Sequence, residues 1–174
     1  MEYRLLTRAE ISRLVQIDRT ESIDDIYYLR DGNLTAEKEH WDVPDWSPEE
    51  KQQRVAVLQE IYDKGATFFG AFDGETLVGM SVLDHNQLRS GVARLNLEGL
   101  WVSHPYREKS IGKTLFRLAA QEARRRGAKT LYVSATPSEN TIRFYMSMGC
   151  HLAESVDSHL FEEEPEDIHL QLML

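Results

Sequence analysis

A short basic segment that contains a glycine lies where a predicted strand ends and a predicted helix begins. It reads Arg107-Glu108-Lys109-Ser110-Ile111-Gly112-Lys113-Thr114. The first backbone N–H groups of a helix have no partner within the helix, and the helix dipole places partial positive charge beside them. Gly112 leaves room for an anion near these amides, and Arg107, Lys109 and Lys113 add formal charge. The segment therefore predicts a binding site for a phosphate-bearing ligand.

Two kinds of phosphate ligand are bound by turns of this type. Gly112-Lys113-Thr114 matches the end of a nucleoside-triphosphate P-loop, but that motif also needs a glycine five residues before Gly112, where this chain has Arg107. The preceding strand is expected to end an antiparallel meander, whereas a P-loop normally follows a parallel strand. The turn that holds the pyrophosphate of coenzyme A is therefore favoured over the P-loop.

The segment Val102–Leu115 resembles the acetyl-CoA signature of the GNAT superfamily of N-acetyltransferases, which is Gln/Arg-x-x-Gly-x-Gly/Ala. Arg107 and Gly112 match this pattern, and Ser110 stands where the first glycine is usual. Serine is small, and the Ser110 hydroxyl could itself cap the helix. The resemblance covers residues 66–174 and implies an acetyl-CoA-dependent N-acetyltransferase.

A second motif strengthens this resemblance, the segment Asn140–Gly149 with the Phe144-Tyr145 pair inside it. In the family an asparagine at this spacing commonly bonds the pantetheine or phosphate arm, and the tyrosine often lies near the thioester sulfur. The alternative is that Phe144 and Tyr145 belong to the helix core and that Asn140 is a surface residue. The resemblance implies that acetyl-CoA contacts Leu100, Trp101, Val102, Arg107, Glu108, Lys109, Ser110, Ile111, Gly112, Lys113, Asn140 and Tyr145.

Acetyl transfer to an aliphatic amine needs a base, because such an amine has a pKa near ~10.4 and is protonated at neutral pH. Glu98 is the first candidate, with a solvent-facing strand carboxylate as the alternative; Asn96 cannot serve as a base. His104 and His85 are further candidates, although each could be an ordinary loop histidine. A β-bulge near Gly99 would change which residues face the cleft.

Other groups would assist the reaction. Backbone N–H groups near Leu100 to Val102, placed by family analogy, would hold the thioester carbonyl. Tyr145, a phenol with an ordinary pKa near ~10, would protonate the departing thiolate. The histidines and the single cysteine show no metal-ligand spacing, so no metal is expected.

The periodicity of the second half predicts the elements that position these residues. Three strands at 66–72, 77–84 and 92–102 form an antiparallel meander with turns at Asp73-Gly74 and Arg89-Ser90-Gly91. A helix over 111–126, a strand over 130–135, a helix capped by Thr136, and strands over 150–154 and 168–174 follow. The order predicts an α/β (α+β) GNAT-like fold, a mixed, mostly antiparallel sheet of about seven strands with helices on both faces.

The first third of the chain is harder to interpret. A strand over 2–6, a helix from Thr7 to about Asp18, an irregular stretch over 19–46 and a helix from Ser47-Pro48 to about Lys64 are expected. We expect one domain over 1–174, with 19–64 as a variable, helical region on the acceptor side and 92–149 as the acetyl-CoA-binding core. The acidic stretch 162–167 is expected to be a solvated loop.

Composition limits the partners. The 174-residue chain carries a net charge of −9, which disfavours general binding of nucleic acid or anionic lipid. It has no apolar run near the ~18 residues of a membrane span, and its start lacks the apolar stretch of a signal peptide, so a cytoplasmic protein is expected. Its one cysteine, Cys150, cannot form a disulfide within the chain. Exposed strand ends are compatible with a homodimer.

The predicted strands do not identify the acceptor. Acidic and aromatic residues over 19–50 and 162–167 suit a small cationic amine, such as a polyamine, an aminoglycoside-like or antibiotic amine, or a lysine side chain. The same acidity could serve only solubility. Two alternatives stay open, a non-catalytic CoA-binding regulatory module and a protein lysine or N-terminal acetyltransferase.

Overall fold

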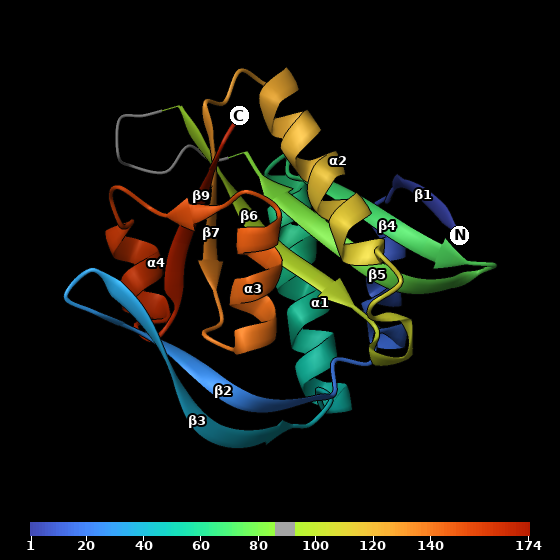
Figure 1. Ribbon diagram of the computed structural model, residues 1–174. Coiled ribbons are helices and arrows are strands. Elements are labelled where there is room, and N and C mark those ends of the chain that lie inside the picture. Colours follow the sequence, from blue (N-terminus) through green and yellow to red (C-terminus); the bar gives the residue numbers. More distant parts are fainter. Residues whose placement is uncertain (86–92) are drawn as a thin grey trace.

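A central sheet of seven strands organises the molecule, seen in a computed structural model that describes residues 1–85 and 93–174 (Figure 1). The strand order is β1-β4-β5-β6-β7-β9-β8, and only β6 and β7 run parallel. The strands are β1 (Glu2–Leu5), β4 (Thr67–Asp73), β5 (Thr76–Asp84), β6 (Arg94–Val102), β7 (Thr130–Ala135), β8 (His151–Leu152) and β9 (Ile168–Met173). The predicted mixed, mostly antiparallel sheet is confirmed. The turn expected at Arg89–Gly91 lies outside the described residues.

Helices cover both faces of this sheet, as predicted. On one face α2 (Ile111–Arg125) and α3 (Glu139–Ser147) bury side chains against β7 and β9 in the largest apolar cluster. On the other face the 3₁₀ helix η1 (Ala9–Gln16) and α1 (Pro48–Asp63) pack on β4 and β5. The short α4 (Ser158–Glu163) lies beside β9, with Phe161 6.0 Å from the His169 ring.

The main correction concerns residues 19–46, which are neither irregular nor helical. They form a long antiparallel hairpin of β2 (Glu21–Arg30) and β3 (Asn33–Val43), so α1 is the only helix within 19–64. The two turn residues, Asp31 and Gly32, have φ values of 50° and 78°. Positive φ at both positions is what a tight hairpin requires, and Asp-Gly is a common sequence for it.

The helix starts follow local capping chemistry. Ser47 caps α1 through a reciprocal bond pair with Glu50, as predicted. The expected cap of α3 at Thr136 is wrong, because Ser138 accepts from the Thr141 N–H instead. The chain just before α3 stays extended because the Pro137 carbonyl accepts the Tyr27 N–H of β2 at 2.7 Å.

The structure also corrects three smaller predictions of secondary structure. The helix expected to begin at Thr7 is the 3₁₀ turn η1, although the Glu10 carboxylate does accept from the Thr7 N–H and hydroxyl. Strand β8 is only two residues long. The acidic stretch at 162–167 begins inside α4, so only its second part is a loop.

The feature that positions the site is the separation of β6 from β7. These strands pair only from Arg94–Thr130 to Asn96–Tyr132. Beyond that point they diverge, as Figure 1 shows, and the β2–β3 hairpin crosses below the end where they part. On the β7 side, the remaining half of β6 therefore has a backbone edge that no strand in the described part of the chain pairs with.

Candidate active site

A β-bulge in β6 places Glu98 at the start of this opening. Val82 of β5 lies opposite Gly99 and Leu83 lies opposite Leu97, so Glu98 has no opposite residue. A bulge re-aims side chains and increases the local twist. The strand thus has a bulge beside Gly99, and Glu98 is its extra residue.

The carboxyl group of Glu98 has an unusual pKa. The side chain is exposed overall, yet the surrounding protein limits hydration of the carboxyl group. This desolvation, together with the negative charge of Asp84 and Glu163, raises its pKa to about 7. Asn96 Nδ2 donates to Glu98 Oε2 at 3.0 Å and, with the charge of Arg54, acts in the opposite direction. A carboxylate with this pKa can act as a base near neutral pH.

Two backbone amides of β6 face the opening. The Ser103 N–H donates to the Val78 carbonyl of β5 at 2.9 Å. Because N–H groups alternate sides along a strand, those of Val102 and Leu100 point away from β5, to the side that β7 has left. They can donate to a ligand oxygen there.

Trp101, between these two residues, is directed elsewhere. Its amide points toward β5, and a Cβ on Gly99 would lie 2.1 Å from its ring, so the indole covers Gly99. The ring packs edge-on against Trp46, with centroids 5.9 Å apart. Trp101 thus belongs to the face that carries α1, and Leu100 and Val102 supply the amides of the opening.

The N-terminus of α2 presents free amides, as the sequence predicts. The Thr114 N–H donates to the Ser110 carbonyl, and the N–H groups of Ile111, Gly112 and Lys113 precede it with no acceptor among residues 1–85 and 93–174. The side chain of Ile111 is buried, so it can offer only its amide. Lys113 is exposed, and the Lys109 ammonium lies 4.7 Å from the Tyr106 ring centroid.

The turn before α2 contains two residues in the left-handed region. Glu108 and Ser110 both have φ of 62°, a conformation that glycine adopts at lower cost. This accounts for the family's glycine at the Ser110 position. Ser110 makes no side-chain cap bond, so the expectation that its hydroxyl caps α2 is wrong.

The glycine at position 112 is not demanded by packing. A Cβ there would lie 3.4 Å from Phe144 and 3.6 Å from Val102, which are ordinary contact distances. Gly112 therefore leaves space beside the free amides that the fold itself does not need.

Arg107 and Asn140 are linked through Glu21. Arg107 donates to the carbonyls of Val102 at 3.3 Å and Arg19 at 3.0 Å, and lies 3.7 Å from Glu21 Oε2. Asn140 donates to Glu21 Oε1 at 3.2 Å. Glu21 thus joins the α2 turn to the start of α3. The sequence does not reveal this role, because Glu21 and Asn140 lie 119 positions apart.

Tyr145 lies in the main core. Its ring packs 5.8 Å from Phe116 and 5.1 Å from Phe144, and its hydroxyl makes no hydrogen bond to any residue that the structure describes. Burial raises the pKa of this phenol. The phenol therefore keeps its proton near neutral pH, so it can donate but cannot act as a base.

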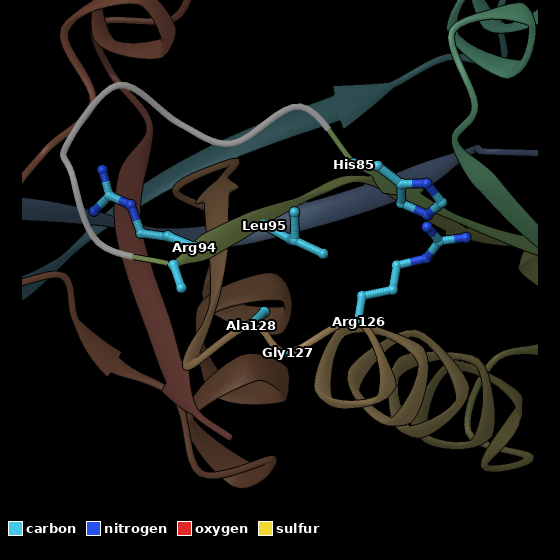
Figure 2. A pocket seen from close by; sticks show the side chains of 7 residues that line it. His85, Arg94, Leu95, Arg126, Gly127 and Ala128 are labelled. Carbon is cyan, nitrogen blue, oxygen red and sulfur yellow. The ribbon is translucent and has the colours of Figure 1, made fainter.

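The two histidine candidates lie outside this arrangement. His85 lines a separate pocket of about 170 Å³ at the other end of the sheet, where it and Arg126 point toward one another (Figure 2). Burial and the charge of Arg126 lower the His85 pKa. His104 is exposed, with Nδ1 2.9 Å from the Thr20 carbonyl.

The described residues contain neither a metal-binding cluster nor a membrane-spanning helix. No group of three or more His, Cys, Asp or Glu side chains in 1–85 and 93–174 could hold a metal ion. Over the same ranges, no helix combines the length and apolar character needed to cross a membrane.

Comparisons with known proteins identify the family and the fold. The model of the acetyltransferase (GNAT) family matches residues 33–150. The fold is similar to a crystal structure of nourseothricin acetyltransferase, with a TM-score of 0.72, 19% identity, and 99% of this chain and 97% of that chain covered. It is also similar to PaiA N-acetyltransferase from Thermoplasma acidophilum in complex with coenzyme A (TM-score 0.65, 17% identity, 99% and 98% covered).

A third similar structure is an aminoglycoside 6′-N-acetyltransferase complexed with coenzyme A, with a TM-score of 0.59, 17% identity, and 74% of this chain and 83% of that chain covered. No curated protein matches the sequence.

Proposed function

The chain belongs to the GNAT family of acetyltransferases, and we propose that it moves an acetyl group from acetyl-CoA to a primary amine by direct attack in a ternary complex. One observation carries the proposal. The opening between β6 and β7 places Glu98, with a pKa of about 7, on the same strand as two backbone amides that lack strand partners.

The donor groups of the chain fit the thioester substrate. The free amides of Ile111, Gly112 and Lys113 suit its diphosphate, and Lys109 and Lys113 add positive charge nearby. The amides of Leu100 and Val102 suit the thioester carbonyl. Donors of this kind typically stabilise a developing oxyanion by roughly 3–4 kcal/mol.

Glu98 supplies the base. Its carboxylate accepts a proton from the acceptor ammonium, directly or through one water, which frees the nitrogen lone pair. The amine nitrogen then forms a bond to the acetyl carbon, the bond from that carbon to sulfur breaks, and the nitrogen loses a second proton to solvent. Tyr145 donates its phenolic proton to the departing thiolate and regains a proton from solvent.

The acceptor side suits a small cationic amine. Asp84 and Glu163 add negative charge around Glu98, which favours an approaching ammonium group. Trp101, which packs edge-on against the buried Trp46, adds aromatic character to the same side. Two of the similar structures are named as acetyltransferases of nourseothricin and of an aminoglycoside, and this supports a small-molecule acceptor.

The test separates cofactor binding from transfer. Acetyl-CoA should raise the melting temperature of the protein, and ATP should not. Gly112→Asp should abolish the shift, because its carboxylate would face the diphosphate, whereas aspartate at a helix start does not disfavour folding. Gly112→Ala, whose Cβ fits at ordinary distances, is the matched control.

Transfer is measured as thiol release with a panel of amines. Release that depends on the amine supports the proposal. No melting shift at millimolar acetyl-CoA, or a normal shift in Gly112→Asp, would place the site elsewhere. A shift without release for any amine would indicate a binding module in place of an enzyme.

A further inference from the structure

Two arginines stack on one tryptophan beside the proposed base. The Arg54 Cζ lies 4.5 Å from the Trp46 ring centroid, and the Arg19 Cζ lies 5.1 Å from it. Trp46 contacts Trp101, whose ring covers Gly99, the residue after Glu98. Arg54 comes from α1 and Arg19 from the segment just before β2. The charges of Arg54 and Glu98 also act on each other, so the pair lies on the Glu98 side of the sheet.

Neither guanidinium has a polar partner within the part of the chain that the structure describes. Three carboxylates act on Arg54 through their charge only, without a hydrogen bond to it: those of Glu164, Glu50 and Glu98. Glu50 instead accepts the Ser47 N–H at 2.7 Å. Partial burial and repulsion from Arg19 lower the pKa of Arg54, so the two cations lie close enough to oppose each other.

Stacking on an aromatic ring occupies the flat face of a guanidinium and leaves its edge free. The N–H groups of that edge form a planar fork that matches a carboxylate or phosphate. Two such forks near one indole, with no acceptor among the described residues, suit an oxyanion. Asp45 does approach Arg19, but its carboxylate accepts hydrogen bonds from the backbone N–H of Arg19 and from the Lys51 ammonium, not from the Arg19 guanidinium.

We propose that Arg19 and Arg54 bind an oxyanion group of the acceptor, so that the preferred acceptor is a primary amine that also carries a carboxylate or a phosphate. The inference rests on the proposed function and refines its substrate class. Glu98, Asp84 and Glu163 attract the ammonium end of the molecule, and the arginine pair attracts the anionic end. The opposed charges orient the amine toward Glu98.

This orientation distinguishes zwitterions from diamines. A diamine of the same length would place its second ammonium beside Arg19 and Arg54, where like charges repel. Three five-carbon amines test this directly, since 5-aminopentanoate, pentylamine and 1,5-diaminopentane differ only in the group opposite the reacting amine. A matched aminoalkyl phosphate tells whether carboxylate or phosphate is the better oxyanion.

The experiment measures kcat/KM for each amine, and binding of each to the protein–CoA complex by calorimetry. In the native protein, an oxyanion-bearing amine should exceed both pentylamine and the diamine by about tenfold or more, which corresponds to ~1.4 kcal/mol. Arg19→Gln, Arg54→Gln and the double variant should bring the ratio to pentylamine close to one. Arg54→Lys, which keeps the charge without the fork, should give an intermediate ratio.

Arg117→Gln is the control, because Arg117 is exposed on α2, away from this side of the sheet, and its substitution should leave rates and ratios unchanged. Circular dichroism confirms that each variant is folded. Equal kcat/KM for the three amines, preference for the diamine, or a ratio that survives both substitutions would overturn the inference while leaving acetyl transfer intact. Arginine-dependent binding of the anionic amine without any transfer would support the inference and refute the proposed function.

Discussion

Asn96 donates a hydrogen bond to Glu98 across one intervening residue of β6, from Nδ2 to Oε2 at 3.0 Å. Asn96 is buried, whereas Glu98, two positions further along the strand, is the bulged residue. The bond therefore fixes the carboxylate from within the sheet. Hydrogen bonding favours the ionised carboxylate, and desolvation opposes it, which leaves the pKa near 7.

The pH dependence of activity should report Glu98. Because its pKa is raised to about 7, the base form accumulates only above that pH, and kcat/KM should rise through pH 7 to a plateau. Glu98→Gln should lower kcat/KM by roughly 10²-fold and remove this limb. A pH–rate profile at saturating acetyl-CoA checks both. Persistence of the limb in the variant would assign the titration to another group.

Removing the Asn96 amide should move the same limb. In Asn96→Ala the carboxylate loses the donor that lowers its pKa, so the rise in kcat/KM should shift to higher pH. Asn33→Ala, in the exposed hairpin turn, is the control and should leave the profile in place. A limb that stays fixed or shifts to lower pH in Asn96→Ala would contradict the role given to this bond.

Ser110→Gly should stabilise the fold. Ser110 has φ of 62° without a cap bond, so glycine relieves left-handed strain and loses no hydrogen bond. After the greater unfolded-state entropy of glycine is included, we expect a gain of about 0.5–1 kcal/mol in the free energy of unfolding, measured in urea. Arg117→Gly, in the regular part of α2, should instead cost about 1 kcal/mol. Destabilisation by Ser110→Gly would show that the hydroxyl has a structural role.

Tyr145→Phe should reduce kcat with little change in stability. The ring fills the core, while its hydroxyl bonds to no residue that the structure describes, so phenylalanine preserves the packing. If the phenol protonates the leaving thiolate, kcat should fall by roughly 10²-fold. Steady-state kinetics and thermal unfolding measure the two effects. An unchanged kcat would make Tyr145 a core residue only.

Glu21→Gln should tighten acetyl-CoA binding. The carboxylate lies between Arg107 and Asn140, two residues expected to contact the cofactor, and its negative charge opposes an anionic ligand. Partly exposed pairs of this kind are worth up to about 1 kcal/mol, so we expect a decrease in Kd of up to roughly fivefold by calorimetry. Glu37→Gln, which removes a charge paired with Arg30 on the same hairpin, serves as the control. Weaker binding in Glu21→Gln would instead make Glu21 a required support.

The sequence predicted those parts of the fold that depend on local pattern. The meander, α2 and the cap at Ser47 follow from periodicity and capping chemistry. The β2–β3 hairpin was missed because most of its side chains are exposed and its register shifts between Ile23 and Asp25, which interrupts the alternation. Its Asp31-Gly32 turn was the available signal.

The candidate site also has features that the local sequence predicts and features that it does not. The free amides of α2 could be predicted from neighbouring residues, whereas the bulge at Glu98 was only considered near Gly99. The Arg19–Trp46–Arg54 stack and the Glu21 link could not, because they join segments far apart in the chain. The left-handed backbone of Ser110 also has no local signal, since serine rarely adopts it.

Strands β6 and β7 separate after only three residue pairs, and this separation affects how far the amino-acid sequence can change during evolution. The donors that this parting exposes are main-chain atoms, so replacing a side chain does not delete them. Mutations can therefore change nearly every side chain along the unpaired half of β6 and still preserve its backbone N–H donors. The only condition is that the two strands separate at the same place. This tolerance is consistent with an architecture shared at 19% identity.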